Sequence, residues 1–65
     1  MPNEDKALRE ALNRIGGKRA MARALGIAQQ AVSKWQKVPV LRVLEVERLT
    51  GVARHDLRPD VYPKP

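Results

Sequence analysis

Apolar residues recur at helical spacing near the start of the chain. Their positions place them on one face of a helix: Ala7, Leu8, Ala11, Leu12 and Ile15. Asn3 is a candidate N-cap, because a short polar side chain there can accept a hydrogen bond from a free backbone N–H. Gly16 can adopt the left-handed backbone that ends a helix without strain. The pattern predicts a helix over residues 4–15.

Two shorter periodic segments follow. The first covers residues 18–25, ends at Gly26 and has an apolar face made of Met21, Ala22 and Leu25. The second is predicted over residues 29–36. Val32 and Trp35 lie three positions apart in it, so both side chains should face the core. Trp35 could instead stack on a nucleic-acid base, but its spacing from Val32 favours packing in the core.

The next apolar run begins with a proline. The residue before a proline avoids helical geometry, whereas proline itself suits the first turn of a helix. We therefore predict a helix from Pro39 to Thr50 and place its end at Gly51. A strand over residues 38–41 is the alternative, but Pro39 and the helix-end signals favour the helix.

Glu47 falls among the apolar positions of this predicted fourth helix. A carboxylate there needs a partner, and Arg54 and Arg58 are the nearest downstream candidates. A short fifth helix is expected over residues 54–57. Residues 58–65 hold three of the five prolines, so this segment is expected to be extended.

Length and composition narrow the fold class. A chain of 65 residues can form one domain with one small core. Because it contains no cysteine and only one histidine, His55, we expect no disulfide, no metal site and no cofactor. Helix packing must therefore stabilise it. We predict an all-α fold, a compact bundle of about five short helices over residues 1–57, followed by an extended Pro-rich tail over residues 58–65.

The charge of the chain is segregated. The formal net charge is +6, and no acidic residue occurs between Glu10 and Glu45. That interval holds Arg14, Lys18, Arg19, Arg23, Lys34, Lys37 and Arg42. An uninterrupted basic middle favours a polyanionic partner such as DNA, which binds basic surfaces through counterion release. A surplus of charge for solubility is the alternative, but solubility does not require segregation by sign.

The second and third predicted helices fit a helix-turn-helix, which is two helices joined by a short turn that contains glycine. Ala22 is small enough to allow a close helix crossing, and Gly26 permits the reversal of the chain. Val32 and Trp35 would hold the second helix of the pair against the core. The polar positions left facing outwards are Gln29, Gln30, Ser33, Lys34 and Lys37.

These outward residue types suit the major groove of DNA. Glutamine can bond to N6 and N7 of adenine, and lysine can donate to guanine, mainly from the N-terminal part of a recognition helix. The expected base readers are Gln29, Gln30, Ser33 and Lys34. The expected phosphate contacts are Lys18, Arg19 and Lys37. A solvated polar face is the alternative, but its place after a suitable turn within a basic segment favours DNA.

At these residues the chain resembles a known family. The segment 18–37 (KRAMARALGIAQQAVSKWQK) resembles the helix-turn-helix of the lambda-type repressor and Cro superfamily. Val38-Pro39, the segment 44–52 (LEVERLTGV) and the segment 54–63 (RHDLRPDVYP) are similar to small Cro-like and YdaS-type antitoxin-like regulators. The resemblance covers nearly the whole chain.

The resemblance implies an all-helical domain that represses transcription by binding operator DNA as a homodimer. By the same analogy, Gln29, Gln30 and Lys34 occupy base-reading positions and Lys18 contacts the DNA backbone. Some Cro relatives replace the C-terminal helices with a β-hairpin, which would change the dimer interface. Here the proline at position 39 and the helix-end signals favour helices.

The leading hypothesis for function is a phage Cro-type repressor that binds double-stranded operator DNA. The alternative is an antitoxin-like protein-interaction module that masks a toxin and binds DNA secondarily. The apolar surplus of the fourth helix and the Pro-rich tail would serve that role. We reject an enzyme, because the chain offers no nucleophile with a paired base and no phosphate-binding loop.

The ends and the hydropathy of the chain bear on its location. The N-terminus is polar and acidic, unlike a signal peptide, and no apolar run approaches the length of a membrane span. We therefore expect a cytoplasmic protein of a bacterial host cell, with no membrane partner and no small-molecule substrate.

Overall fold

The computed structural model describes residues 4–64 and contains only helices, turns and irregular segments over that range. In chain order the elements are α1 (Lys6–Ile15), α2 (Lys18–Leu25), α3 (Gln29–Ser33), the 3₁₀ turn η1 (Val40–Arg42), α4 (Val43–Thr50) and α5 (Arg54–Leu57). The all-α prediction with about five short helices is confirmed. The alternative of a strand over residues 38–41 is wrong.

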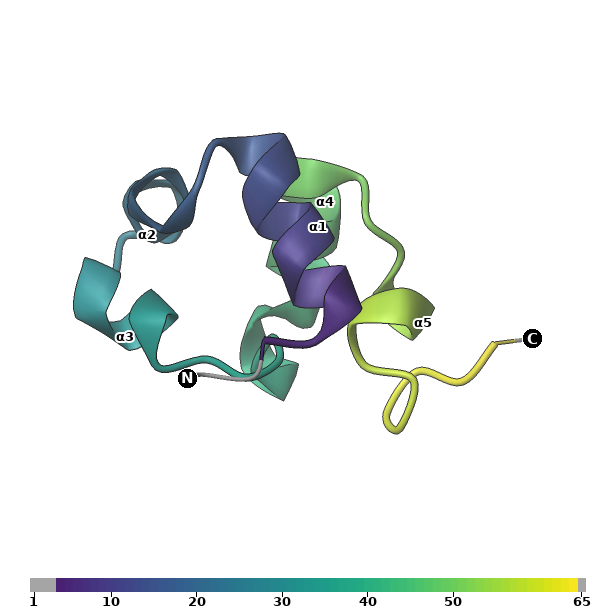
Figure 1. The fold of residues 1–65 in the computed structure, drawn as a ribbon. Helices are drawn as coiled ribbons and strands as arrows, with labels where there is room; N and C mark the ends of the chain where they lie inside the picture. The colour runs from purple at the N-terminus through teal and green to yellow at the C-terminus, as the bar shows by residue number, and fades with distance from the viewer. Residues whose placement is uncertain (1–3, 65) are drawn as a thin grey trace.

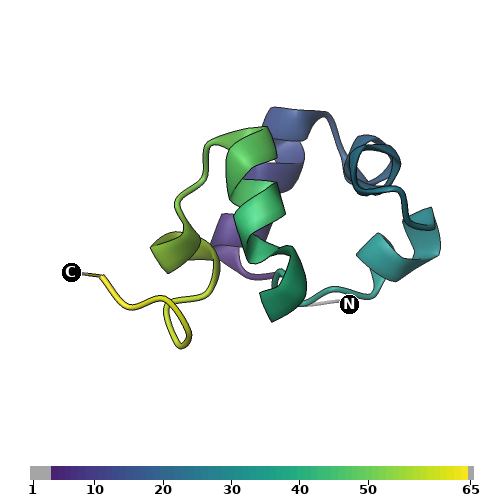
Figure 2. The same cartoon turned by 180° about the vertical axis from the view of Figure 1, so that it is seen from behind.

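α1 and α4 pack against each other in the middle of the molecule (Figures 1 and 2). The α2–α3 pair lies on one side of them, and α5 with the C-terminal segment lies on the other. None of the helices within residues 4–64 is long and apolar enough to cross a bilayer. The arrangement leaves α3 at the edge of the domain, where its outer face is open to solvent.

The core joins all five helices. Its buried side chains are Leu8, Ala11, Leu12, Met21, Ala22, Leu25, Val32, Val38, Val43, Val46, Val52 and Leu57. Burying each large apolar side chain stabilises the fold by about 1.5–3 kcal/mol. Trp35 and Tyr62 pack on the edge of this core and are partly buried. The prediction that Trp35 packs in the core is confirmed at this edge position.

The start of α1 differs from the prediction. The helix begins at Lys6, and its N-cap is Asp5, whose carboxylate accepts a hydrogen bond from the backbone N–H of Leu8 at 2.8 Å. A start at residue 4 with Asn3 as N-cap is therefore wrong, although Asn3 itself lies outside the described residues. The backbone N–H of Asp5 donates to the carbonyl of Gln36 at 2.8 Å, which holds Asp5 in an extended conformation. Such a distant contact leaves no trace in local sequence.

α3 is three residues shorter than predicted and ends at Ser33. The backbone N–H groups of Lys34 and Trp35 donate to carbonyls three residues back, at 3.3 and 3.1 Å, as in a tightened last turn. The chain must leave the helix here, because Trp35 packs on the core and the Gln36 carbonyl is engaged by Asp5.

The predicted helix from Pro39 to Thr50 is divided into η1 and α4. Pro39 is extended, with ψ of 145°, and the first turn after it is the 3₁₀ turn η1, which ends at Arg42 with ψ of −4°. Val38 is fully buried, so the chain stays extended across Val38 and Pro39 to bring that side chain into the core. The predicted end at Gly51, in the left-handed conformation, is confirmed.

Glu47 of α4 pairs with Arg54 at the start of α5, one of the two partners predicted. Its carboxylate accepts hydrogen bonds from the backbone N–H of Arg54 at 2.8 Å and from Nε of the same residue at 3.1 Å. These hydrogen bonds hold the pKa of Glu47 below its usual value. Since Arg54 is the first residue of α5, the carboxylate satisfies an otherwise free N–H group of that helix.

The C-terminal segment is folded back over residues 58–62. The backbone N–H groups of Val61 and Tyr62 both donate to the carbonyl of Arg58, at 3.1 and 2.8 Å. The guanidinium of Arg54 lies 5.8 Å from the centre of the Tyr62 ring. The expectation of an extended tail is wrong for these residues, because packing of Tyr62 on the core bends the chain. The division of the chain after residue 57 stays a prediction.

Candidate nucleic-acid interface

α2 and α3 form a tight pair around a glycine turn (Figure 1). Gly26 adopts a left-handed backbone with φ of 71°, which a side chain would strain. The backbone N–H of Ile27 donates to the carbonyl of Ala22 at 3.0 Å, closing the end of α2. Ala22 is buried between the helices, as its small size requires. The predicted bounds of α2 and its glycine turn are confirmed.

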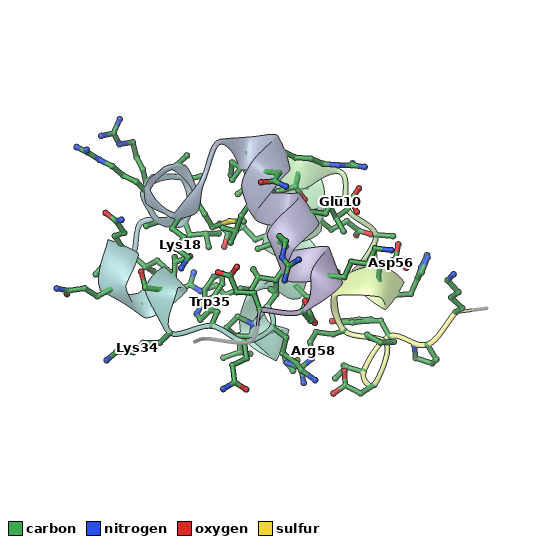
Figure 3. The ribbon with its side chains drawn as sticks, viewed as in Figure 1. Glu10, Lys18, Lys34, Trp35, Asp56 and Arg58 are labelled. Atoms are coloured by element: carbon green, nitrogen blue, oxygen red, sulfur yellow. The ribbon has the colours of Figure 1, made fainter. Side chains whose placement is uncertain are left out.

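The buried side of α3 determines which side chains face outwards. Val32 is fully buried, so the positions before and after it along the helix point away from the core. Gln29 and Gln30 are exposed in the first turn of α3, and Lys34 is exposed just beyond its last residue. Figure 3 shows Lys34 directed away from the body of the protein. We call Gln29, Gln30, Ser33 and Lys34 the α3 face.

Ser33 differs from the other three members of the α3 face. It is half-buried, and its hydroxyl donates a hydrogen bond to the carbonyl of Gln29 at 3.1 Å. The oxygen remains able to accept a hydrogen bond, but its proton is already used within the helix. Gln29, Gln30 and Lys34 therefore have side chains that are more available to a ligand than that of Ser33.

Of the three predicted phosphate contacts, two are plainly available. Arg19 on α2 and Lys37 after α3 are exposed. Lys18 is only 33% exposed, and its Nζ lies 3.3 Å from Oε2 of Glu4. That oxygen is buried and makes no hydrogen bond, so the ion pair with Lys18 is what offsets its charge. The pairing lies between residues remote in sequence and was missed.

Arg23 is a further candidate that the sequence reasoning did not include. It is exposed near the end of α2, four residues after Arg19, so both lie on the same side of that helix. This spacing is readable in the sequence. The segment from residue 11 to residue 44 contains no acidic residue, so no carboxylate of α2 or α3 offsets the charge of Arg19 and Arg23, whereas Lys18 is paired with Glu4. An anionic polymer would be attracted to this side of the molecule.

The α1 and α5 side of the domain carries a different kind of surface. A pocket of about 300 Å³, partly open to solvent, is lined by Lys6, Ala7, Glu10 and Asp56, on the α1 and α5 side (Figure 3). Within residues 4–64, His, Asp and Glu side chains do not gather in threes, as ligands of a metal ion would. The exposed basic and amide side chains described above belong to α2, to α3 and to the residues that directly follow α3.

The fold is that of a helix-turn-helix domain of the Cro type. The structure matches that of the Cro protein from prophage element Xfaso 1 of Xylella fastidiosa strain Ann-1 with a TM-score of 0.84. The two proteins are 37% identical, and the match covers 92% of this chain and 100% of the other. The resemblance to Cro proteins predicted from sequence is confirmed.

The sequence comparisons define the family more narrowly. The family described as bacterial toxin YdaS matches residues 8–65. The Escherichia coli (strain K12) protein YdaS, provisionally named a transcriptional regulator, is 36% identical over 67 aligned residues. That alignment covers 94% of this chain and 68% of the relative. The chain therefore belongs to the YdaS family.

Proposed function

We propose that this protein is a sequence-specific transcriptional repressor of the Cro type, which inserts α3 into the major groove of double-stranded operator DNA as a homodimer. The names of its relatives, a regulator and a Cro protein, support a DNA-binding regulator and not an enzyme. With DNA as its target, it would act in the cytoplasm of a bacterial host. The repressor, operator and homodimer assignments are our own.

The observation that carries this proposal is the exposed polar start of α3. Gln29 and Gln30 lie in the first turn, where recognition helices contact base edges. Each amide can form a bidentate pair with adenine, and Lys34 can donate to O6 or N7 of guanine. Arg19 and Lys37 lie outside this set and suit phosphates, which position a helix without reading sequence.

A five-residue helix reaches few base pairs, so one copy would read a short sequence. Two copies related by two-fold symmetry would place two α3 helices in successive major grooves, about 34 Å apart. The operator should accordingly be a short pseudo-palindrome. Binding over a promoter would block transcription sterically.

Fluorescence anisotropy tests the proposal directly. The full chain is titrated into labelled duplex DNA that flanks its own gene, and into a scrambled duplex of the same composition, at about 50 mM and about 200 mM salt. We expect salt-sensitive binding to both, with a preference of about a thousandfold or more for the flanking DNA. Weak and equal binding to both duplexes would show that the basic side is only a non-specific surface.

A protein-interaction role is the second candidate. The exposed apolar side chains of η1 and α4 favour it, because a monomer in water gains nothing from exposing them. The sequence-based version of this hypothesis was an antitoxin, whereas the matching family is described as a toxin. Co-purification with the product of an adjacent gene, without binding to the flanking DNA, would favour this alternative.

A further inference from the structure

Three apolar side chains lie together on the surface at the start of α4. Leu41 is 95% exposed, Leu44 is 49% exposed and Val40 is 40% exposed. Val40 and Leu44 are four residues apart, and Leu41 and Leu44 are three apart, so they share one side of the η1–α4 segment. We call these three residues the apolar face. A leucine exposed to this degree contributes nothing to the core of its own chain.

We propose that the apolar face is the surface on which a second copy of this chain docks. The inference rests on the proposed function to the extent that a homodimer is part of it. It goes further by naming the surface, which neither the fold nor the position of α3 specifies.

The distribution of charge favours a second copy over a different partner. Two copies with a net charge of +6 each repel one another across most of their surfaces. Residues 1–39 carry eight Lys or Arg and three Asp or Glu, whereas residues 40–60 carry four of each. The second segment, which contains the apolar face, is therefore electrically neutral. An acidic partner protein would be drawn instead to the basic side formed by α2 and α3.

The charges around the apolar face are also paired within the chain. Arg42 lies 3.5 Å from Glu45, next to Leu41 and Leu44 in sequence. Pairs with one charge of each sign are self-complementary, because a two-fold axis can bring the arginine of one copy to the glutamate of the other. Approach of a second copy here therefore buries apolar surface beside a pair of charges, Arg42 and Glu45, that offset one another.

The position of the apolar face leaves the DNA-binding side free. In Figure 2, α4 lies in front of α1, with η1 at its lower end, while α3 lies off to one side. A second copy on the apolar face would therefore leave the α3 face of each copy uncovered. One protein can then dimerise and bind DNA at the same time.

Sedimentation equilibrium without DNA tests this surface, with protein from about 10 μM to about 1 mM, since a small interface gives a weak dimer. We expect the mass of the wild-type chain to rise from 7.3 kDa towards twice that value. Leu41→Ser should weaken self-association about tenfold or more, because each dimer loses two buried leucines and the net charge is unchanged. Leu44→Ser should weaken it in the same direction.

Leu49→Ser is the matched control, because Leu49 is also a partly exposed leucine of α4 but is not part of the apolar face. It should associate like the wild type. Circular dichroism should show that Leu41→Ser has the same melting temperature as the wild type, since the Leu41 side chain is almost fully exposed. A wild-type chain that stays at 7.3 kDa throughout, or a Leu41→Ser variant that associates normally, overturns the proposal.

The outcome is independent of the DNA proposal. If the wild type dimerises through the apolar face but binds flanking and scrambled DNA equally, the interface stands and the repressor function fails. If it prefers the flanking DNA but associates equally well with serine at position 41, the function stands and the interface is wrong.

Discussion

Arg58 donates two hydrogen bonds to the carboxylate of Asp60, from Nε to Oδ1 at 3.0 Å and from Nη2 to Oδ2 at 2.8 Å. The remaining donor, Nη1, reaches the carbonyl of Val38 at 3.1 Å. Val38 lies in the connection between α3 and η1, so one side chain joins the C-terminal turn to the segment that follows α3. Figure 3 shows Arg58 below α1, between these two segments.

The Arg58–Asp60 pair makes stability depend on pH. The hydrogen bonds from Arg58 lower the pKa of Asp60 from 3.8 to about 2. A carboxyl group whose pKa is lower in the folded state than in the unfolded state stabilises the fold at any pH above its unfolded-state pKa. This contribution is lost as pH falls from 3.8 through about 2. Asp60→Asn should therefore be less stable than the wild type at pH 5, and the difference should shrink below pH 3.8.

Urea unfolding, followed by circular dichroism at several values of pH, measures this difference. Asp56→Asn is the control, because it removes a carboxylate from α5 whose side chain is about half exposed. For this control, the difference from the wild type in free energy of unfolding should not shrink in the same way as pH falls. If the difference in free energy of unfolding between the wild type and Asp60→Asn stays constant from pH 5 to pH 2, the ion pair does not stabilise the fold.

Gln30→Ala should weaken binding to the flanking DNA more than binding to scrambled DNA. The expected loss is about 1–3 kcal/mol on the specific duplex, the usual effect of removing a bidentate base contact. Gln36→Ala is a matched control, because Gln36 is exposed but lies beyond α3. Anisotropy titrations of each variant against the two duplexes, at one salt concentration, measure these losses of affinity. Equal losses on the two duplexes would remove Gln30 from the base readers.

Lys18 should contribute to DNA affinity without reading sequence. Lys18→Ala is expected to weaken binding to both duplexes and to reduce the slope of log K against log salt by about 0.9, the value for one phosphate contact. Lys6→Ala is the control, because Lys6 lines the pocket on the α1 and α5 side. An unchanged salt slope in Lys18→Ala would argue against a phosphate contact.

If Lys18 contacts a phosphate as we propose, Glu4 should compete with DNA for its ammonium group. Because Oε2 of Glu4 lies 3.3 Å from Nζ, a phosphate at Lys18 must displace or share that contact. Glu4→Gln should therefore raise affinity for both duplexes. The increase should disappear in the double variant with Lys18→Ala, and a persistent increase there would assign it to net charge alone.

Gly26→Ala should destabilise the domain by about 1–2 kcal/mol, the cost of a left-handed backbone for an L residue with a side chain. The φ of Gly26 is 71°, and no atom lies within 4 Å of an added Cβ, so the cost is conformational rather than steric. Gly26→Asn should lose less stability than Gly26→Ala, because asparagine tolerates the left-handed conformation better than alanine does. Chemical unfolding followed by Trp35 fluorescence measures both. Equal losses in the two variants would show that another effect is responsible.

Local pattern determined much of this protein. The bounds of α2 and α5, the ends of helices at Gly26 and Gly51, and the outward direction of Gln29, Gln30 and Lys34 all followed from spacing and from glycine conformation. These features depend on interactions within a few residues, because the periodicity of a helix places neighbours on known faces. The assignment of the α3 face to base reading stays a prediction.

Tertiary structure decided the features that depend on contacts between distant residues. The N-cap of α1 moved to Asp5 because its N–H bonds to Gln36, and Lys18 is held by Glu4 at the other end of α1. The turn over residues 58–62 is held by the hydrogen bond from Arg58 to Val38, twenty positions earlier, and by the packing of Tyr62 on the core. Such pairings arise only after the core has brought the segments together, since the energy of each hydrogen bond or ion pair depends on burial and distance and not on sequence spacing.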